Sequence, residues 1–132
     1  MFSLFKHIPV YIKISRNKIE VTNLHTGETL YRTASPAFST DRLVMAHFNY
    51  AESLIRSTLK EMNFSKSLFP PVLKMLIQQV EPVEEGLTEI EKRAYRDLAE
   101  QAGAVKAYLV EHFRPLSDHD ALEEFKKKPS FL

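Results

Sequence analysis

The segment from Gly86 to Phe113 constrains the fold of this chain more than any other stretch. Thr88 followed three residues later by Glu91 forms a capping box, the pair that satisfies free backbone amides at the start of a helix. Gly103 is suited to the left-handed position that ends many helices. The mostly apolar residues 105–110 then predict a buried strand. A helix, a glycine and an apolar strand make up half of an α/β crossover.

The apolar side chains of this predicted helix recur every four residues and predict one narrow buried stripe. Its members are Ile90, Ala94, Leu98 and Ala102. Because two of the four are alanines, the helix can lie close to a sheet. On the solvent side, we expect an i,i+4 ion pair between Glu89 and Arg93.

Alternating hydrophobicity before this segment predicts a three-stranded antiparallel meander. In the first strand, Val10, Ile12 and Ile14 share one face, and Ile19 and Val21 share a face of the next. Gly27 is placed to allow a turn before the third strand. The further elements predicted are a third strand at 29–33, a helix at about 50–62, a strand at 72–79 and a short charged helix at 120–127.

Length and composition limit the class of protein. A chain of 132 residues suits a single domain, and 44% apolar content is enough for a core. The net charge of +1 gives no electrostatic case for binding nucleic acid. Cysteine is absent, which excludes disulfides, thiolate metal sites and a cysteine nucleophile.

The same segment resembles the MreB bacterial actins of the actin-like ATPase superfamily. That family has a helix of the type T-x-x-E-R-R-A, then A-G-A, then a strand ending in L-I-E-E-P; residues 87–94, 102–104 and 108–111 are similar here. Residues 43–48, LVMAHF, are similar to the family's G-V-I-A-D-F, with His47 in place of the acid. An actin contains two such units, and this chain has the length of the first alone.

The resemblance and the order of predicted elements imply an α/β fold. We expect a single ribonuclease-H-like unit of order β-β-β-α-β-α-β, with helices packed on a mixed five-stranded sheet. It would span residues 10–115, after an apolar lead-in at 1–9 and before a charged tail at 116–132.

The phosphate-binding loop of the family is degenerate in this chain. Actin-type ATPases carry D-x-G-T at the end of the first strand, where this sequence reads Lys13-Ile14-Ser15-Arg16. Lysine replaces the acid and Ser15 replaces the glycine. We therefore expect no nucleotide or other cofactor and no enzymatic activity.

A metal-dependent hydrolase or nuclease on a ribonuclease-H-like fold is the alternative. It needs clustered carboxylates that begin with an acid on the first strand, where Lys13 stands. His112 and His119 lie near Asp118 and Asp120, but a polar C-terminal tail is the favoured interpretation of these residues over a metal site.

The favoured function is a non-catalytic binding or scaffolding module. The resemblance implies a role in cell shape or the bacterial cytoskeleton, in the cytoplasm or at the inner face of the membrane, with a second copy or an actin-like protein as partner. A peripheral membrane adaptor is a third interpretation, since MreB-type proteins often carry apolar anchors at the two places concerned. The residues that would make membrane or partner contact are Phe2, Leu4, Phe5, Leu68 and Phe69; the alternative is that they pack onto the core.

Overall fold

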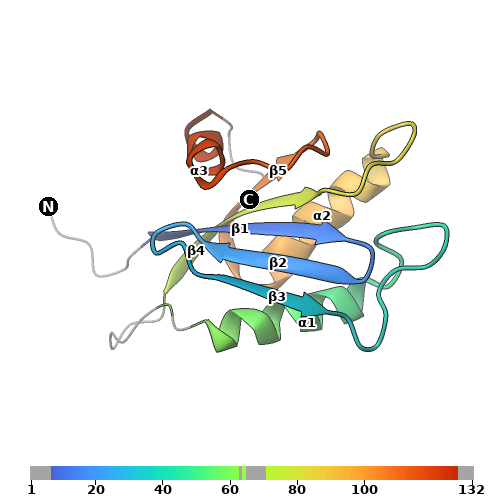
Figure 1. Cartoon of the computed structure of the whole chain (residues 1–132), viewed down its shortest axis with the longest axis horizontal. Coiled ribbons are helices and arrows are strands. Elements are labelled where there is room, and N and C mark those ends of the chain that lie inside the picture. Colours follow the sequence, from blue (N-terminus) through green and yellow to red (C-terminus); the bar gives the residue numbers. More distant parts are fainter. Residues whose placement is uncertain (1–6, 63, 65–70, 128–132) are drawn as a thin grey trace, which may run out of the picture.

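The computed structural model describes residues 7–62, 64 and 71–127. The elements are β1 (His7–Ser15), β2 (Lys18–Asn23), β3 (Thr29–Thr33), α1 (Phe48–Glu61), β4 (Val72–Gln79), α2 (Glu89–Gln101), β5 (Ala104–Val110) and α3 (Asp118–Lys127). The strands form one five-stranded sheet in the order β3-β2-β1-β4-β5 (Figure 1). The predicted α/β class and mixed five-stranded sheet are confirmed.

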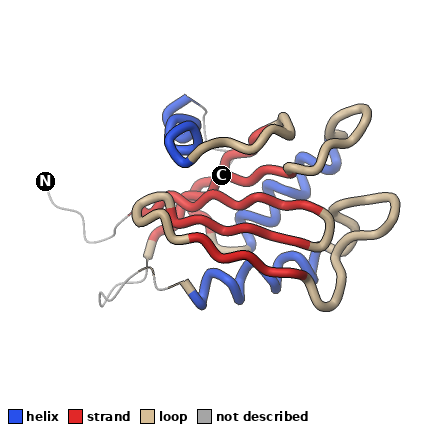
Figure 2. Tube along the Cα trace, in the orientation of Figure 1, coloured by secondary structure: helices blue, strands red, loops and turns tan. Residues whose placement is uncertain are grey.

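β1 lies at the centre of the sheet and joins its two halves. It pairs antiparallel with β2 on one side and parallel with β4 on the other. β3 continues the antiparallel half and β5 the parallel half. Helices α1 and α2 lie on one face of the sheet and α3 on the other (Figure 2). The molecule therefore has three layers.

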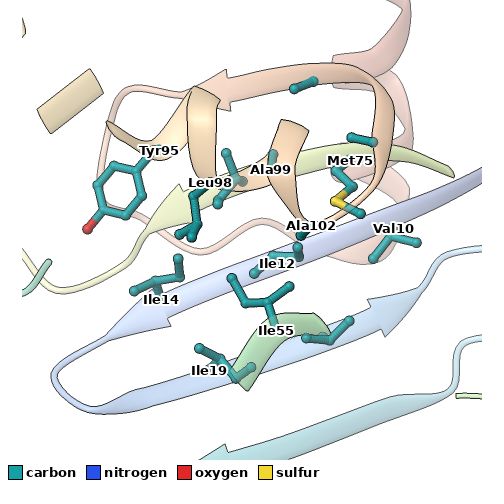
Figure 3. Packing of buried hydrophobic residues seen from close by; sticks show 14 of the residues in the cluster. Val10, Ile12, Ile14, Ile19, Ile55, Met75, Tyr95, Leu98, Ala99 and Ala102 are labelled. Atoms are coloured by element: carbon teal, nitrogen blue, oxygen red, sulfur yellow. The ribbon is translucent and has the colours of Figure 1, made fainter. Parts of the chain in front are cut away.

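The alternation predicted for β1 divides its side chains between two cores. Val10, Ile12 and Ile14 are fully buried in the larger core, against α1 and α2. Figure 3 shows Ile12 and Ile14 on the side of the sheet that carries Leu98 of α2. Tyr11 points to the opposite face and belongs to the smaller core under α3.

The capping box of α2 is present, but the predicted buried stripe is correct only for Leu98 and Ala102. The Glu91 amide donates to Thr88 Oγ1 over 3.1 Å, and the Thr88 amide donates to Glu91 Oε1 over 2.9 Å. Ile90 is 82% exposed, and Ala94 is only half-buried. The buried residues are Tyr95, Leu98, Ala99 and Ala102.

The geometry of the helix explains this correction. Each four-residue step advances about 40° around an α-helix, so a strict four-residue repeat drifts off the buried face. Mixed steps of three and four residues keep Tyr95, Leu98, Ala99 and Ala102 together. The predicted Glu89–Arg93 pair also differs, because Glu89 instead forms its ion pair with Lys92, over 3.4 Å.

The charged helix predicted near the C-terminus is present as α3 and covers part of the second face. Ala121 is fully buried there. Phe125 packs edge-on against Tyr108 of β5, with 5.1 Å between ring centroids. Although most of its residues are polar, α3 thus covers the smaller core, which also contains Leu76 of β4.

Candidate functional site

The ends of β1 and β4 define the candidate site. These strands are parallel neighbours, so their carboxyl ends meet at the same edge of the sheet. The chain leaves β1 towards β2 on one side and leaves β4 through α2 towards β5 on the other. In open α/β sheets, ligands bind at the carboxyl edge where connections diverge in this way. The predicted degenerate loop falls at this edge.

Arg16 links the turn after β1 to Glu81, which lies two residues after the end of β4. Its backbone amide donates to Glu81 Oε1 over 2.9 Å, and its Nε donates to Glu81 Oε2 over 3.0 Å. Its Nη1 donates to the carbonyl of Thr40. The guanidinium therefore has an ion-pair partner in Glu81 and a second hydrogen-bond acceptor in the Thr40 carbonyl.

Asn17 fastens the same turn to the loop between β3 and α1. Its φ of 56° lies in the left-handed region, which asparagine tolerates better than most residues. The Asn17 amide donates to Ser39 Oγ over 3.0 Å, and the Ser39 amide donates to Asn17 Oδ1 over 2.8 Å. This reciprocal pair gives the turn one fixed shape.

The three residues of the predicted loop are not brought together. Lys13 lies on the α3 face of the sheet, where its Nζ forms an ion pair with Glu20 over 3.1 Å and lies 5.0 Å from the centroid of the Tyr11 ring. Ser15 is the last residue of β1 and is opposite Lys18. Arg16 instead contacts Glu81, two residues after the end of β4.

A buried polar network lies beside this edge, on the α3 face. The Tyr11 hydroxyl donates to Gln78 Oε1 and accepts from the Leu116 amide over 3.0 Å. Gln78 Nε2 donates to the carbonyls of His112 and Arg114, over 3.0 and 2.8 Å. Burial raises the pKa of Tyr11 to about 12, partly offset by the Leu116 hydrogen bond. The network ties the chain after β5 to the centre of the sheet.

A second glutamine–tyrosine pair lies on the α2 face. Tyr95 donates its hydroxyl to Gln79 Oε1, and Gln79 Nε2 donates to the carbonyl of Glu81 over 2.7 Å. Burial raises the pKa of Tyr95 too, and the charge of Glu91 adds to that effect. Both tyrosines are therefore neutral hydrogen-bonding groups at neutral pH, rather than phenolates that could act as bases.

The imidazole rings of the histidines singled out from the sequence make none of the hydrogen bonds described above, although the backbone carbonyl of His112 accepts from Gln78. His112 and His119 line one hollow of about 550 Å³ between the end of β5 and α3, together with Asp120. Within residues 7–62, 64 and 71–127, no three His, Asp or Glu side chains gather as ligands for a metal ion. His47 occupies the N-cap of α1 without a side-chain capping bond, and its ring centroid lies 5.6 Å from that of Tyr50.

The most constrained polar residues of the edge were not predicted. They are Ser39, Gln78, Gln79 and Glu81. One signal was available, since two adjacent glutamines end the apolar run of β4, where amides need buried partners. Ser39 and Glu81 carry no such signal, because their partners lie far away in the sequence.

The proposed membrane or partner contacts Phe2, Leu4, Phe5, Leu68 and Phe69 lie outside the described residues. Among the helices that the structure describes, none combines the length and the apolar character needed to cross a bilayer. No protein-family model matches the sequence, and a search of curated proteins finds no match.

Proposed function

We propose that this chain is a non-catalytic binding or scaffolding module built on a single MreB-like, ribonuclease-H-like unit. The order of elements from β1 to β5 supports this assignment, together with the similarity of residues 87–111 to the bacterial actins. The partner would be a second copy or an actin-like protein. The site of action would be the cytoplasm or the inner face of the membrane, in a process linked to cell shape.

The backbone hydrogen bonds of the turn after β1 argue against nucleotide turnover. A phosphate loop works because free backbone amides point at the phosphate oxygens. In this turn, the amide of Arg16 already donates to the carboxylate of Glu81, and the amide of Asn17 already donates to Ser39. A phosphate would have to displace both partners while approaching the negative charge of Glu81. The arrangement favours a closed structural turn over an anion site.

Calorimetry with Mg²⁺ and ATP tests the first half of the proposal. We expect no binding heat from this chain, while a two-domain actin-like ATPase titrated in parallel gives saturable heat. Saturable, Mg²⁺-dependent heat or phosphate release from this chain would overturn the proposal and would favour the metal-dependent hydrolase.

Light scattering and filament co-sedimentation test the second half. We expect either a species larger than the monomer or co-sedimentation with filaments of an MreB-type protein. A chain that remains monomeric and stays in the supernatant would contradict the binding role.

A further inference from the structure

Within the part of the chain that the structure describes, β3 is an edge strand that turns alternate backbone groups away from its neighbour β2. Hydrogen bonds join Asn17 to Ala34 and Asn23 to Glu28 at the two ends of the β2–β3 pairing, each 2.8 Å long. Hydrogen-bonded and non-hydrogen-bonded pairs alternate along an antiparallel ladder. The residues of β3 that point their N–H and C=O groups away from β2 are therefore Thr29, Tyr31 and Thr33.

β3 also exposes its largest side chain. Tyr31 is 68% exposed, and β3 is an outer strand of the sheet that the structure describes. The only charged residue of β3, Arg32, turns towards α1, where it forms an ion pair with Glu61. Arg32 Nη1 also donates to the Tyr31 carbonyl over 2.8 Å, and a carbonyl oxygen can accept a second hydrogen bond. Open edges of this kind are templates for pairing with another strand.

We propose that β3 pairs antiparallel with β3 of a second copy, with Tyr31 at the two-fold axis. This register places Thr29 opposite the second copy's Thr33 and Tyr31 opposite its own equivalent. Each outward-facing residue then meets another outward-facing residue, and each such pair exchanges two hydrogen bonds.

The side-chain pattern favours a second copy over an unrelated peptide. Thr-x-Tyr-x-Thr keeps its order of residue types when reversed, so a two-fold axis gives threonine–threonine and tyrosine–tyrosine pairs, both favourable across strands. Arg32 faces Leu30 of the second copy rather than another arginine. The short edge gives a small interface, and we therefore expect a weak, concentration-dependent dimer.

This inference rests on the proposed binding function and names the surface that would carry self-association. Two matched double variants test the register by analytical ultracentrifugation over a range of concentrations. Thr29→Lys/Thr33→Lys places lysine opposite lysine at both ends of the interface. Thr29→Lys/Thr33→Glu places lysine opposite glutamate there. Both variants lose the 2.8 Å contact between the Thr22 and Thr29 hydroxyls, so any cost of that loss is shared.

We expect the lysine–lysine variant to weaken dimerisation at least about tenfold, and the lysine–glutamate variant to dimerise at least as well as the wild type. Tyr31→Pro is an independent variant. Because the Tyr31 amide points outward, proline removes no hydrogen bond to β2, and we expect a monomer with an unchanged melting temperature. If a double variant fails to fold, as judged by circular dichroism, Tyr31→Pro decides the question.

A wild-type chain that stays monomeric at all concentrations would overturn the inference. So would a dimer that is equally strong in both double variants, or one that survives Tyr31→Pro, because either result moves the interface elsewhere. None of these outcomes bears on the expectation that the chain does not turn over nucleotide. Binding to an actin-like filament would still support the proposed function. Conversely, Mg²⁺-dependent ATP binding would refute the proposed function while leaving the dimer interface measurable.

Discussion

Tyr11 links the centre of the sheet to the segment that follows β5. Its hydroxyl donates to Gln78 and accepts from the amide of Leu116, while its ring is fully buried. Loss of its proton would remove the donor and place a negative charge in the smaller core. Burial therefore raises its pKa from 10.0 to about 12.

This shift predicts alkaline destabilisation with a defined pH range. Above pH 10 the unfolded chain loses the tyrosine proton that the folded chain retains, so the free energy of unfolding falls as pH rises. The contribution of Tyr11 is complete below about pH 10 and is lost between about pH 10 and 12. Tyr95 acts in the same direction. Urea unfolding at pH 8, 9, 10 and 11 measures the decline.

Tyr11→Phe provides the control for this prediction. At pH 8 we expect it to cost about 1–3 kcal/mol, because Gln78 Oε1 and the Leu116 amide lose their partner. The variant should then lose less stability between pH 8 and 11 than the wild type does. An equally steep decline in the variant would show that Tyr11 does not contribute to it.

At the scale of the element, the start of α2 depends on residues close together in the sequence, whereas its buried face does not. Its start depends on Thr88 and Glu91, which lie within one turn of each other. Its buried face depends on where the sheet lies, and the sheet is made of strands distant in sequence. Tyr95 joins that face because its hydroxyl finds a partner in Gln79.

Two substitutions in α2 distinguish the observed buried face from the predicted stripe. Leu98→Ala removes a fully buried side chain and should cost about 2–5 kcal/mol through lost burial and the cavity left behind. Ile90→Ala removes an exposed side chain and should change stability by no more than about 0.5 kcal/mol. Chemical denaturation of both variants checks the difference. Similar losses would mean that α2 is rotated relative to the sheet.

The difference between contacts that are close in the sequence and contacts that are distant explains which parts of the fold and of the site could be predicted. The alternation of Val10, Ile12 and Ile14 and the capping box at Thr88 are short-range patterns, and both predictions were correct. The contacts of Arg16 with Glu81 and of Asn17 with Ser39 join separate elements. No periodicity or motif encodes such pairs, so the closed turn became visible only in three dimensions.

At the scale of the whole molecule, the two faces of the sheet are covered unequally. Among the described residues, the larger core lies under two helices, whereas α3 is the one helix over the smaller core. α3 docks through Ala121 and through the packing of Phe125 on Tyr108. We therefore expect the α3 layer to be the easier one to detach.

Ala121→Arg tests this expectation. A large charged side chain in place of a fully buried alanine cannot be accommodated without moving α3, and we expect a loss of at least about 2 kcal/mol. Binding of a hydrophobic dye should increase as Tyr108 becomes exposed. His119→Arg, on the exposed side of the same helix, is the matched control and should leave dye binding unchanged. Equal dye binding by both variants would argue against a separable layer.

The central position of β1 has a consequence for how the chain is made. β1 leaves the ribosome before the strands on both of its sides, and β4, its neighbour on one side, follows only after β2, β3 and α1. At about 5–20 residues per second, the wait from the end of β1 to the end of β4 lasts roughly 3–13 s. During that time β1 lacks its parallel neighbour, and α2 has yet to cover its part of the apolar face of the meander. We expect chaperone contact to concentrate in this interval and to end when β4 enters the sheet.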